Sequence, residues 1–297
     1  MLFSDDLRRF RKLLIFGLAI FGFSLLLLSR SSANSVREFP QELTLHKWEL
    51  TTSRFQCRLN SNVTGLGSIV LNAAAGGVHY ITLEPDFFIK EARHIRVAVQ
   101  QSPWRHSHYL NALGGVQAEP DKQFEMRINV ARVVEDLQQG HQLVVEIQRE
   151  AVNPVHIKIP AMNFQKTAAT FYQCYGELLA LNYEQAKETL LYYPSSRSHI
   201  SPEQLSHLDD LATYILVDKS ITNVAIDAHT DSRGDRLENL QLSKVRASRV
   251  YRYLRSKGIS EQRLTMRFHG DRYPVATNAT VAGRNKNRRV KITLSRR

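Results

Sequence analysis

The hydrophobic pattern of this chain changes its period once, and that change constrains the fold more than any other feature. Between residues 43 and 160, apolar residues alternate with polar ones or form short runs, with turn residues such as Gly76-Gly77, Gly140 and Asn153-Pro154 between them. A period of two is typical of strands, whereas the period becomes helical over Ala168–Leu181. An antiparallel β sandwich or barrel is therefore expected first. The expected strands are Trp48–Leu50, Ser68–Leu71, His79–Leu83, His94–Val99, Phe124–Val130, Gln142–Ile147 and Val155–Ile159.

From Leu181 onward, strand and helix patterns alternate. Ser201-Pro202-Glu203-Gln204 has the spacing of a capping box with proline in the first turn, and predicts a helix to Val217. A second helix is expected over Leu237–Lys257, ended by Gly258. This order predicts a layered α/β domain, so the whole chain is expected to be α+β. The expected strands are Thr189–Tyr193, Ile221–Ala228, Leu264–Phe268 and Arg289–Leu294, with the stretch Gly270–Asn287 as a loop.

The first 33 residues have the pattern of a secretory signal peptide. Arg8, Arg9, Arg11 and Lys12 precede an apolar run of 16 residues, Leu13–Leu28, and small residues end at Ala33. We expect cleavage after Ala33, and residues 34–297 are expected to leave the cytoplasm. The alternative is an uncleaved anchor, because the run is long for a signal and Arg30 follows it closely. The predicted division is residues 1–33 as signal peptide, 34–180 as a β-rich domain and 181–297 as the α/β domain.

The two cysteines, Cys57 and Cys174, both lie in the part of the chain expected to be exported. An oxidising compartment favours a disulfide between them. The alternative is a pair of buried thiols that pack as small apolar residues. Two cysteines do not make a structural zinc site, and no His-x3-His spacing lies near them, so neither a metal nor a cofactor is expected.

The formal net charge of +12 is concentrated in the last quarter of the chain. Residues Ile221–Arg297 contain 18 Lys and Arg against 6 Asp and Glu, while the remainder is balanced. A basic domain is typical of proteins that bind anionic partners, of which nucleic acid is the commonest. Export makes nucleic acid a poor candidate, so a different anionic partner is expected.

A candidate binding pair lies in this basic part. His229-Thr230-Asp231 follows a predicted strand, and Arg246 lies on the flank of the apolar stripe of the following helix. Asp231 and Arg246 are expected to face each other across a shallow pocket, where a carboxylate and a guanidinium suit the ammonium and carboxylate of an amino acid. Two alternatives remain open: an Asx turn or helix cap at Asp231, and a simple salt bridge between the two side chains.

The C-terminal part resembles the OmpA-like peptidoglycan-binding domain over about 110 residues. The matching motifs are His229-Thr230-Asp231, Gly234, Asn239, Leu242-Ser243, Arg246-Ala247, Gly258-Ile259, Arg263-Leu264, Gly270, Pro274, Asn278, Gly283-Arg284 and Asn287-Arg288-Arg289-Val290. The resemblance implies that Asp231 and Arg246 hold the diaminopimelate of a peptidoglycan stem peptide, with Thr230, Asn239 and Arg289 as further site residues. Glu238 departs from the family, where an aromatic residue often stands.

The upstream part resembles the N-terminal domain of the MotY family of sodium-type flagellar motor proteins. The matching segments are Trp48, Arg54–Leu59, Gly65-Leu66-Gly67, Ser102–Arg105 and Phe171–Cys174. The resemblance implies a non-enzymatic periplasmic protein associated with the flagellar basal body and the cell wall. Its expected partners are a MotX-like ring protein, the basal body and the stator units.

Two other functions are weighed against this one. An enzyme would use His229, Asp231 and His269 as metal ligands or acid-base groups. His229 and Asp231 are two residues apart and could bind a metal together, but the sequence around this pair offers no obvious further ligand and no Glu as a general base. A general cell-envelope anchor without a flagellar role fits the C-terminal motifs equally well, and only the upstream resemblance favours the flagellar motor.

Overall fold

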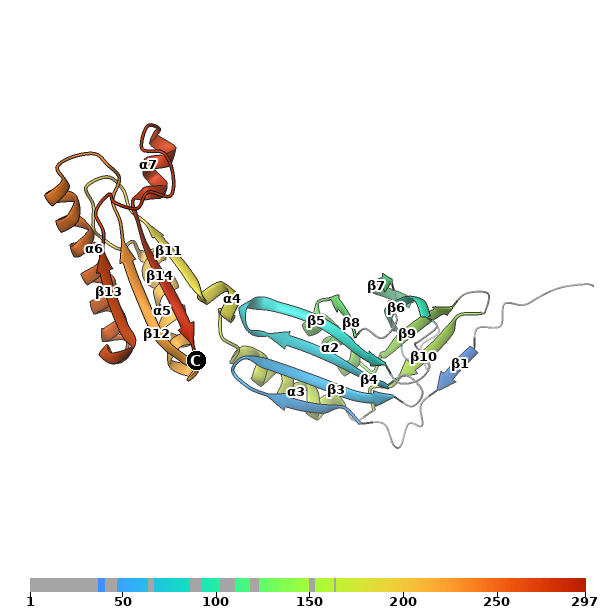
Figure 1. The fold of residues 1–297 in the computed structure, drawn as a ribbon. Coiled ribbons are helices and arrows are strands. Elements are labelled where there is room, and N and C mark those ends of the chain that lie inside the picture. Colours follow the sequence, from blue (N-terminus) through green and yellow to red (C-terminus); the bar gives the residue numbers. More distant parts are fainter. Residues whose placement is uncertain are drawn as a thin grey trace, which may run out of the picture.

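The computed structural model describes residues 37–40, 47–63, 67–85, 92–101, 110–117, 123–149, 153–162 and 164–297 (Figure 1). The expected signal peptide, Gly65 and the Ser102–Arg105 motif lie outside these ranges. Within them, no helix is both long and apolar enough to cross a membrane.

Two five-stranded sheets enclose the first hydrophobic core. One sheet has the order β1-β10-β9-β6-β7 and the other β2-β3-β4-β5-β8, and all pairs are antiparallel except β1 with β10. Leu59 and Ile81 from one sheet and Val145 and Ile157 from the other are buried in the same core, which confirms the expected sandwich. The strands are β1 (Arg37–Pro40), β2 (Glu49–Thr52), β3 (Gln56–Val63), β4 (Gly67–Ala74), β5 (Val78–Pro85), β6 (Ala92–Gln100), β7 (Leu110–Gln117), β8 (Phe124–Arg127), β9 (Gln142–Arg149) and β10 (Val155–Ile159).

The alternating pattern explains most of these strands. Three strands within the described residues, β1, β3 and β7, are not among the expected ones. In β3, Cys57, Leu59 and Val63 are buried, whereas Arg58 is exposed. Because Ser61 takes one of its inward positions, the apolar pattern of β3 is weaker than in its neighbours.

The expected strand over Phe124–Val130 is wrong at its end. The strand β8 stops at Arg127, and Val130 begins the helix α2 (Val130–Gln138). Asn129 caps this helix, because its side-chain oxygen accepts a hydrogen bond from the Arg132 amide at 3.1 Å. Valines and a leucine at helical spacing form the buried face of α2: Val130, Val133, Val134 and Leu137.

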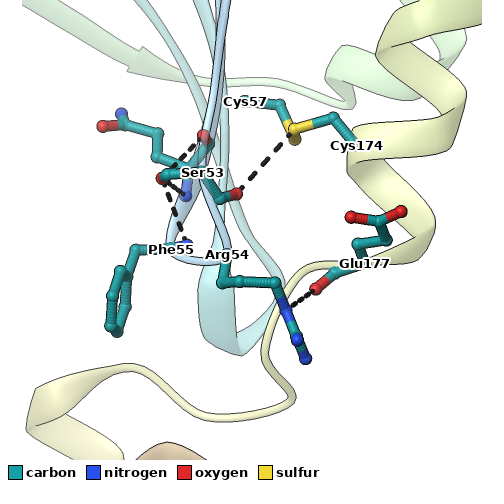
Figure 2. Close-up of a disulfide and its surroundings, with 7 residues drawn as sticks. Ser53, Arg54, Phe55, Cys57, Cys174 and Glu177 are labelled. Atoms are coloured by element: carbon teal, nitrogen blue, oxygen red, sulfur yellow. Dashed lines mark hydrogen bonds between the residues drawn. A yellow bond between two sulfur atoms is a disulfide. The ribbon is translucent and has the colours of Figure 1, made fainter. Parts of the chain in front are cut away.

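The helix α3 (Phe164–Gly176) packs against β2, β3 and α2, and it ends earlier than the expected Leu181. Its first residue, Phe164, lies edge-on to Trp48 with ring centroids 5.7 Å apart. The Trp48 indole donates to the Pro160 carbonyl at 3.1 Å. Near the other end of α3, Cys174 forms the expected disulfide with Cys57 of β3 (Figure 2). The disulfide therefore joins the helix to the sheet on which it packs.

The C-terminal part is a four-stranded sheet with helices, as expected. The sheet has the order β11-β14-β12-β13, in which β12 and β13 are parallel and the other pairs antiparallel. Val224 and Ile226 of β12 pack with Leu211 of α5 and Val250 of α6 in a second core. The elements are α4 (Tyr183–Ala186), β11 (Glu188–Tyr192), α5 (Pro202–Val217), β12 (Ile221–Ala228), α6 (Arg236–Ser256), η3 (Glu261–Arg263), β13 (Leu264–Phe268), α7 (Val281–Asn287) and β14 (Arg289–Arg296).

Local capping explains where these helices begin. Ser201 and Gln204 form the reciprocal capping box of α5 that the sequence predicts. The stretch expected to be a loop up to Asn287 contains the short helix α7, because the Thr280 hydroxyl accepts from the Gly283 amide and starts a helical turn. The second core begins in the chain with Leu179, apart from the contribution of Ala75. The division at residues 180 and 181 stays a prediction.

The disulfide should stabilise the first domain more than the second. The two cysteines are 117 residues apart, and closing a loop of that length is expected to contribute about 4 to 5 kcal/mol, less any strain. Calorimetry of the oxidised protein, the reduced protein and the Cys57→Ser/Cys174→Ser variant should show a lowered transition for the β-rich domain. Thiol labelling of the denatured, non-reduced protein gives an independent check. Two labelled thiols per chain would contradict the disulfide.

Candidate functional site

The polar residues expected to form the site lie at one edge of the C-terminal sheet. The strand β12 ends at Ala228 and leads into His229-Thr230-Asp231, while β11 ends at Tyr192 and β13 at Phe268. Because β14 runs antiparallel to β11 and β12, its start at Arg289 lies at this same edge. The chain thereby gathers connections from all four strands at one place.

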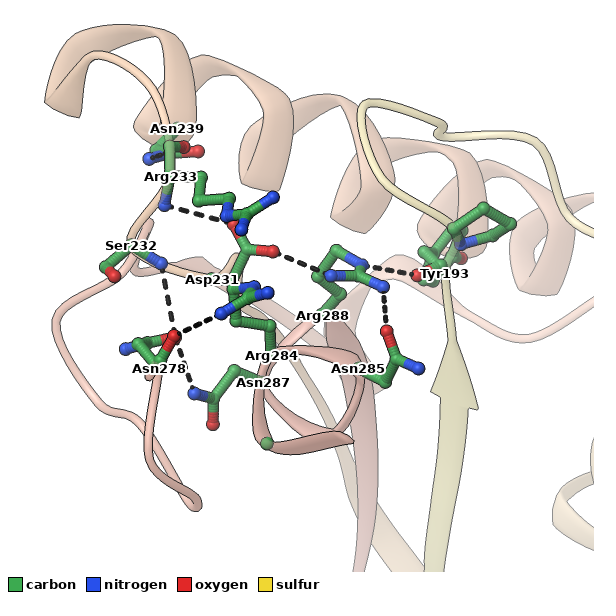
Figure 3. Close-up of polar contacts among 12 residues, drawn as sticks. Tyr193, Asp231, Ser232, Arg233, Asn239, Asn278, Arg284, Asn285, Asn287 and Arg288 are labelled. Atoms are coloured by element: carbon green, nitrogen blue, oxygen red, sulfur yellow. Dashed lines mark hydrogen bonds and ion pairs between the residues drawn. The ribbon is translucent and has the colours of Figure 1, made fainter. Parts of the chain in front are cut away.

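Asp231 is buried and pairs with Arg288, not with Arg246 (Figure 3). Its Oδ2 lies 2.7 Å from Arg288 Nη1, and its Oδ1 accepts from the Arg233 amide at 3.1 Å. Arg288 is held in turn by its Nε, which donates to the Tyr193 carbonyl at 3.0 Å, and by the Asn285 side chain. Arg288 belongs to one of the family motifs in the sequence but is not among the expected site residues.

Arg246 is fully buried, whereas the helix periodicity predicts a flank position beside the loop. Its guanidinium donates to the carbonyls of Arg197 at 2.8 Å, His229 at 3.2 Å and Pro194 at 3.3 Å. The guanidinium carbon lies 4.8 Å from the centre of the Tyr193 ring. Burial lowers the pKa of Arg246 to about 10, so the group stays charged at neutral pH. Among the salt bridges within the described residues, Arg246 has no carboxylate partner.

Tyr193 therefore contacts both arginines, by its carbonyl and by its ring. It is 3% exposed, and its hydroxyl has no hydrogen-bond partner among the described residues. Burial raises the pKa of Tyr193 to about 12, so the hydroxyl is protonated at neutral pH. Tyr193 is not among the expected site residues, because an aromatic residue at the end of a predicted strand is usually part of the core.

The other expected site residues have different roles. Thr230 is buried, and its hydroxyl has no hydrogen-bond partner within the described part of the chain. Asn239 donates to the Arg233 carbonyl at 3.0 Å and so ties the Asp231 loop to α6. Arg289 bonds to the carbonyls of Asn287 and Tyr273 instead of contacting Asp231.

Two asparagines connect the Asp231 loop to α7. The Asn278 side-chain oxygen accepts from the Ser232 amide at 3.3 Å and from the Asn287 side chain at 2.8 Å. Asn287 is fully buried and also accepts from the amides of Val275 and Ala276. Arg284 donates to the Asn278 carbonyl at 2.7 Å. The loop that precedes α7 is thereby fixed beside Asp231 (Figure 3).

The histidines considered as metal ligands make a different arrangement. The rings of His229 and His269 stack with centroids 4.7 Å apart, and His269 Nε2 lies 2.8 Å from an Asp227 oxygen. Asp227 also receives a bidentate pair from Arg267, at 2.7 and 2.6 Å. No group of three or more His, Cys, Asp and Glu side chains in the described ranges is placed to hold a metal ion.

Two family models match the chain, one for each part. The model for the MotY N-terminal domain matches residues 39–180, and that for the OmpA family matches residues 192–288. Between them they cover most of the sequence that the structure describes.

Among curated proteins, the sodium-type flagellar protein MotY of Vibrio parahaemolyticus is similar over most of its length. It is 24% identical over 262 residues, which are 84% of this chain and 87% of that protein. The peptidoglycan-associated lipoprotein of Buchnera aphidicola is 34% identical over 36% of this chain and 65% of its own length. The outer-membrane lipoprotein YfiB of Pseudomonas aeruginosa is 32% identical over 39% of this chain and 68% of its own length.

The buried His229 should make the C-terminal domain sensitive to acid. Burial, with help from nearby Arg289, lowers the pKa of His229 to about 4, whereas the unfolded chain titrates near about 6.5. The unfolded state therefore binds more protons between these values, and stability should be lost as the pH falls from about 6.5 towards about 4. The slope due to this group reaches at most about 1.4 kcal/mol per pH unit.

This dependence can be measured by urea unfolding of the parent, His229→Asn and His199→Asn proteins at a series of pH values. His199 is exposed, so its replacement should leave the acid sensitivity unchanged, while His229→Asn should reduce it. Equal pH slopes for all three proteins would show that His229 does not cause the acid sensitivity.

Proposed function

Since the chain belongs to the MotY family, joining a MotY N-terminal domain to an OmpA-family domain, we propose that it is a non-enzymatic flagellar motor component that binds peptidoglycan. Association with the cell envelope follows from both family matches. We further propose a periplasmic location at the basal body and cell wall.

One observation carries the proposal for the binding site: a carboxylate and two guanidiniums gathered at one sheet edge. Asp231 and Arg288 form an ion pair of 2.7 Å. The guanidinium of Arg246 bonds the carbonyl of His229, which is in the same loop as Asp231. The α-amino-acid end of diaminopimelate carries an ammonium beside a carboxylate, which matches the two halves of the Asp231–Arg288 pair. Exchange of that pair for the ligand would keep both buried charges paired.

Arg246 supports a carboxylate ligand for an electrostatic reason. Within the described part of the chain, its donors reach backbone carbonyls, which satisfy its hydrogen bonds but leave a whole positive charge in a buried position. A buried charge is stabilised strongly by an opposite charge nearby. We therefore propose that Arg246 attracts the ligand carboxylate and supports the loop, while Thr230 and Tyr193 provide hydroxyl groups for hydrogen bonds.

The β-rich domain is proposed to dock on the basal body. The similarity to a flagellar protein extends over both domains, which favours the motor over a general envelope anchor. We propose that this domain forms a ring with a MotX-like partner and helps to hold the stator units, while the C-terminal domain attaches the ring to the wall.

Removing either expected ligand group should weaken binding to purified sacculi. Loss of one partner from a buried charge pair costs about 2 to 5 kcal/mol of binding free energy, which is roughly 30-fold or more in affinity. An exposed charge contributes under about 1 kcal/mol. Asp231→Ala and Arg246→Ala should therefore fail to sediment with sacculi at physiological salt. Arg252→Ala removes an exposed arginine from the same helix and should sediment like the parent.

Controls separate a binding role from a structural one. Circular dichroism and thermal unfolding show whether each variant is folded. If Arg246→Ala does not fold, Arg246→Lys, which retains the charge, is measured in its place. Arg288→Ala removes the ion-pair partner of Asp231 but leaves the Asp231 carboxylate available to the ammonium of the ligand. If folded Asp231→Ala and Arg246→Ala proteins sediment as fully as the parent, the cluster is structural and peptidoglycan binds elsewhere.

The flagellar role predicts a specific phenotype for loss of the protein. Deletion should leave flagella assembled but cells non-motile, because stator units would lack their attachment. Swimming in soft agar and electron microscopy of filaments measure the two effects. Full-length Asp231→Ala fused to a fluorescent protein should still reach the basal body. Normal swimming of the deletion strain would support a general envelope anchor instead.

A further inference from the structure

The tip of the β4–β5 hairpin belongs to the first domain in sequence but packs against the second. This tip is the short turn η1 (Ala75–Gly77). Ala75 is 2% exposed and lies in the core of the C-terminal domain. The Gly76 amide donates to the Leu179 carbonyl at 3.0 Å, and the Gly76 carbonyl accepts from the Gln185 side chain at 3.2 Å. Both backbone groups of Gly76 are thus used by the segment that joins the domains.

A second segment of the β-rich domain, at Arg54 and Phe55, also contacts the residues that join the two domains. The Arg54 carbonyl accepts from the Leu179 amide at 3.0 Å. The Arg54 side chain donates to the Glu177 carbonyl at 2.8 Å (Figure 2). The neighbouring Phe55 ring lies edge-on to Tyr214 of α5, with centroids 6.0 Å apart. The residues just after α3 are therefore held by the first domain before they enter the second.

The connecting helix α4 is also fixed on its other side. The Arg296 guanidinium, at the end of β14, lies 3.6 Å from the centre of the Tyr183 ring. Arg296 itself is paired with Asp218 at 2.8 Å. Gln185 has two roles, because its oxygen accepts from the Asn182 amide in the capping box of α4 while its nitrogen bonds Gly76. In Figure 1, α4 lies between the hairpin tip and the C-terminal sheet.

From these contacts we infer that the hairpin tip and residues 53–56 are a docking element that fixes the orientation of the C-terminal domain on the β-rich domain. Domains joined by a simple linker are expected to move relative to each other unless a packed interface prevents it. Here the packed interface consists of backbone hydrogen bonds, a buried alanine and an aromatic contact. The inference does not depend on which ligand the polar edge binds.

The docking element lies at the opposite end of β14 from the candidate site. Arg288 precedes this strand and Arg296 ends it, and eight residues of strand span roughly 26 Å. A mechanical force applied at the candidate site would therefore be transmitted along β14 to Arg296, α4 and the hairpin tip. A protein that connects two fixed structures transmits force better through such a junction than through a flexible tether.

Two adjacent glycines allow a matched test. Gly76 and Gly77 both have positive φ, +74° and +71°, so alanine carries a similar backbone cost at each. At Gly76 a Cβ would lie 2.0 Å from the Gln185 side-chain oxygen and 2.9 Å from the Asn182 amide nitrogen, whereas at Gly77 no atom of the described residues lies within 4 Å of it. Only the change at Gly76 should disturb the docking.

The experiment compares the full mature chain with Gly76→Ala, Gly76→Val and Gly77→Ala by small-angle scattering and by timed trypsin digestion. We expect the Gly76 variants to have a larger radius of gyration and cleavage after Lys187 at least tenfold faster. Gly77→Ala should match the parent. Gln185→Ala should change both readouts in the same direction as Gly76→Ala without any backbone strain.

Circular dichroism and disulfide content confirm that each variant is folded. If Gly76→Val and Gln185→Ala are folded and scatter and digest as the parent does, the junction is a tether and the inference is wrong. If Gly77→Ala changes as much as Gly76→Ala, the effect is backbone strain in the hairpin, which also overturns the inference. Binding to sacculi should persist in all variants, so these results are independent of the proposed ligand site.

Discussion

The polar edge of the C-terminal domain depends on one buried guanidinium. Arg246 donates to carbonyls in two separate segments, the β11–α5 connection and the end of β12, from a position on α6. These bonds determine where Asp231 and Arg288 can lie, because His229 is two residues before Asp231, and Tyr193, whose carbonyl holds Arg288, immediately precedes Pro194. Burying a charge costs several kcal/mol unless its hydrogen bonds are satisfied. The carbonyls therefore stabilise the buried Arg246, and Arg246 in turn holds the segments that carry these carbonyls.

The same principle explains much of the basic charge of the domain. Arg246, Arg284 and Arg289 bind backbone carbonyls, and Arg288 pairs with Asp231. Other arginines, on the outer face of α6, are exposed: Arg249, Arg252 and Arg255. The charge therefore has two physical roles. Buried guanidiniums hold irregular loops in place, because five N–H donors can satisfy several carbonyls at once, while exposed ones give a long-range attraction to anionic surfaces that salt screens.

Local patterns in the sequence were sufficient for most elements and failed where two signals competed. The capping box at Ser201 predicted the start of α5, and alternation predicted β10 at its observed bounds. The helix α2 was missed, although Asn129 and its valines have helical spacing, because β-branched residues after a strand also favour more strand. The early end of α3 reflects tertiary contacts, since Leu179 bonds Arg54 across the domain junction.

By itself the sequence determined the two-part α+β fold and the loop that carries the candidate site, and it favoured a Cys57–Cys174 disulfide over two buried thiols, because periodicity, motif spacing and the expected export signal are read directly from the residues. Only the tertiary structure decided that Asp231 pairs with Arg288, 57 residues away, and that Arg246 is buried. The first depends on the register of β14 against β12, in which Ala228 lies opposite Val290. The second depends on the β11–α5 connection folding over α6. Neither register nor a long-range loop contact follows from the spacing of residues along one element.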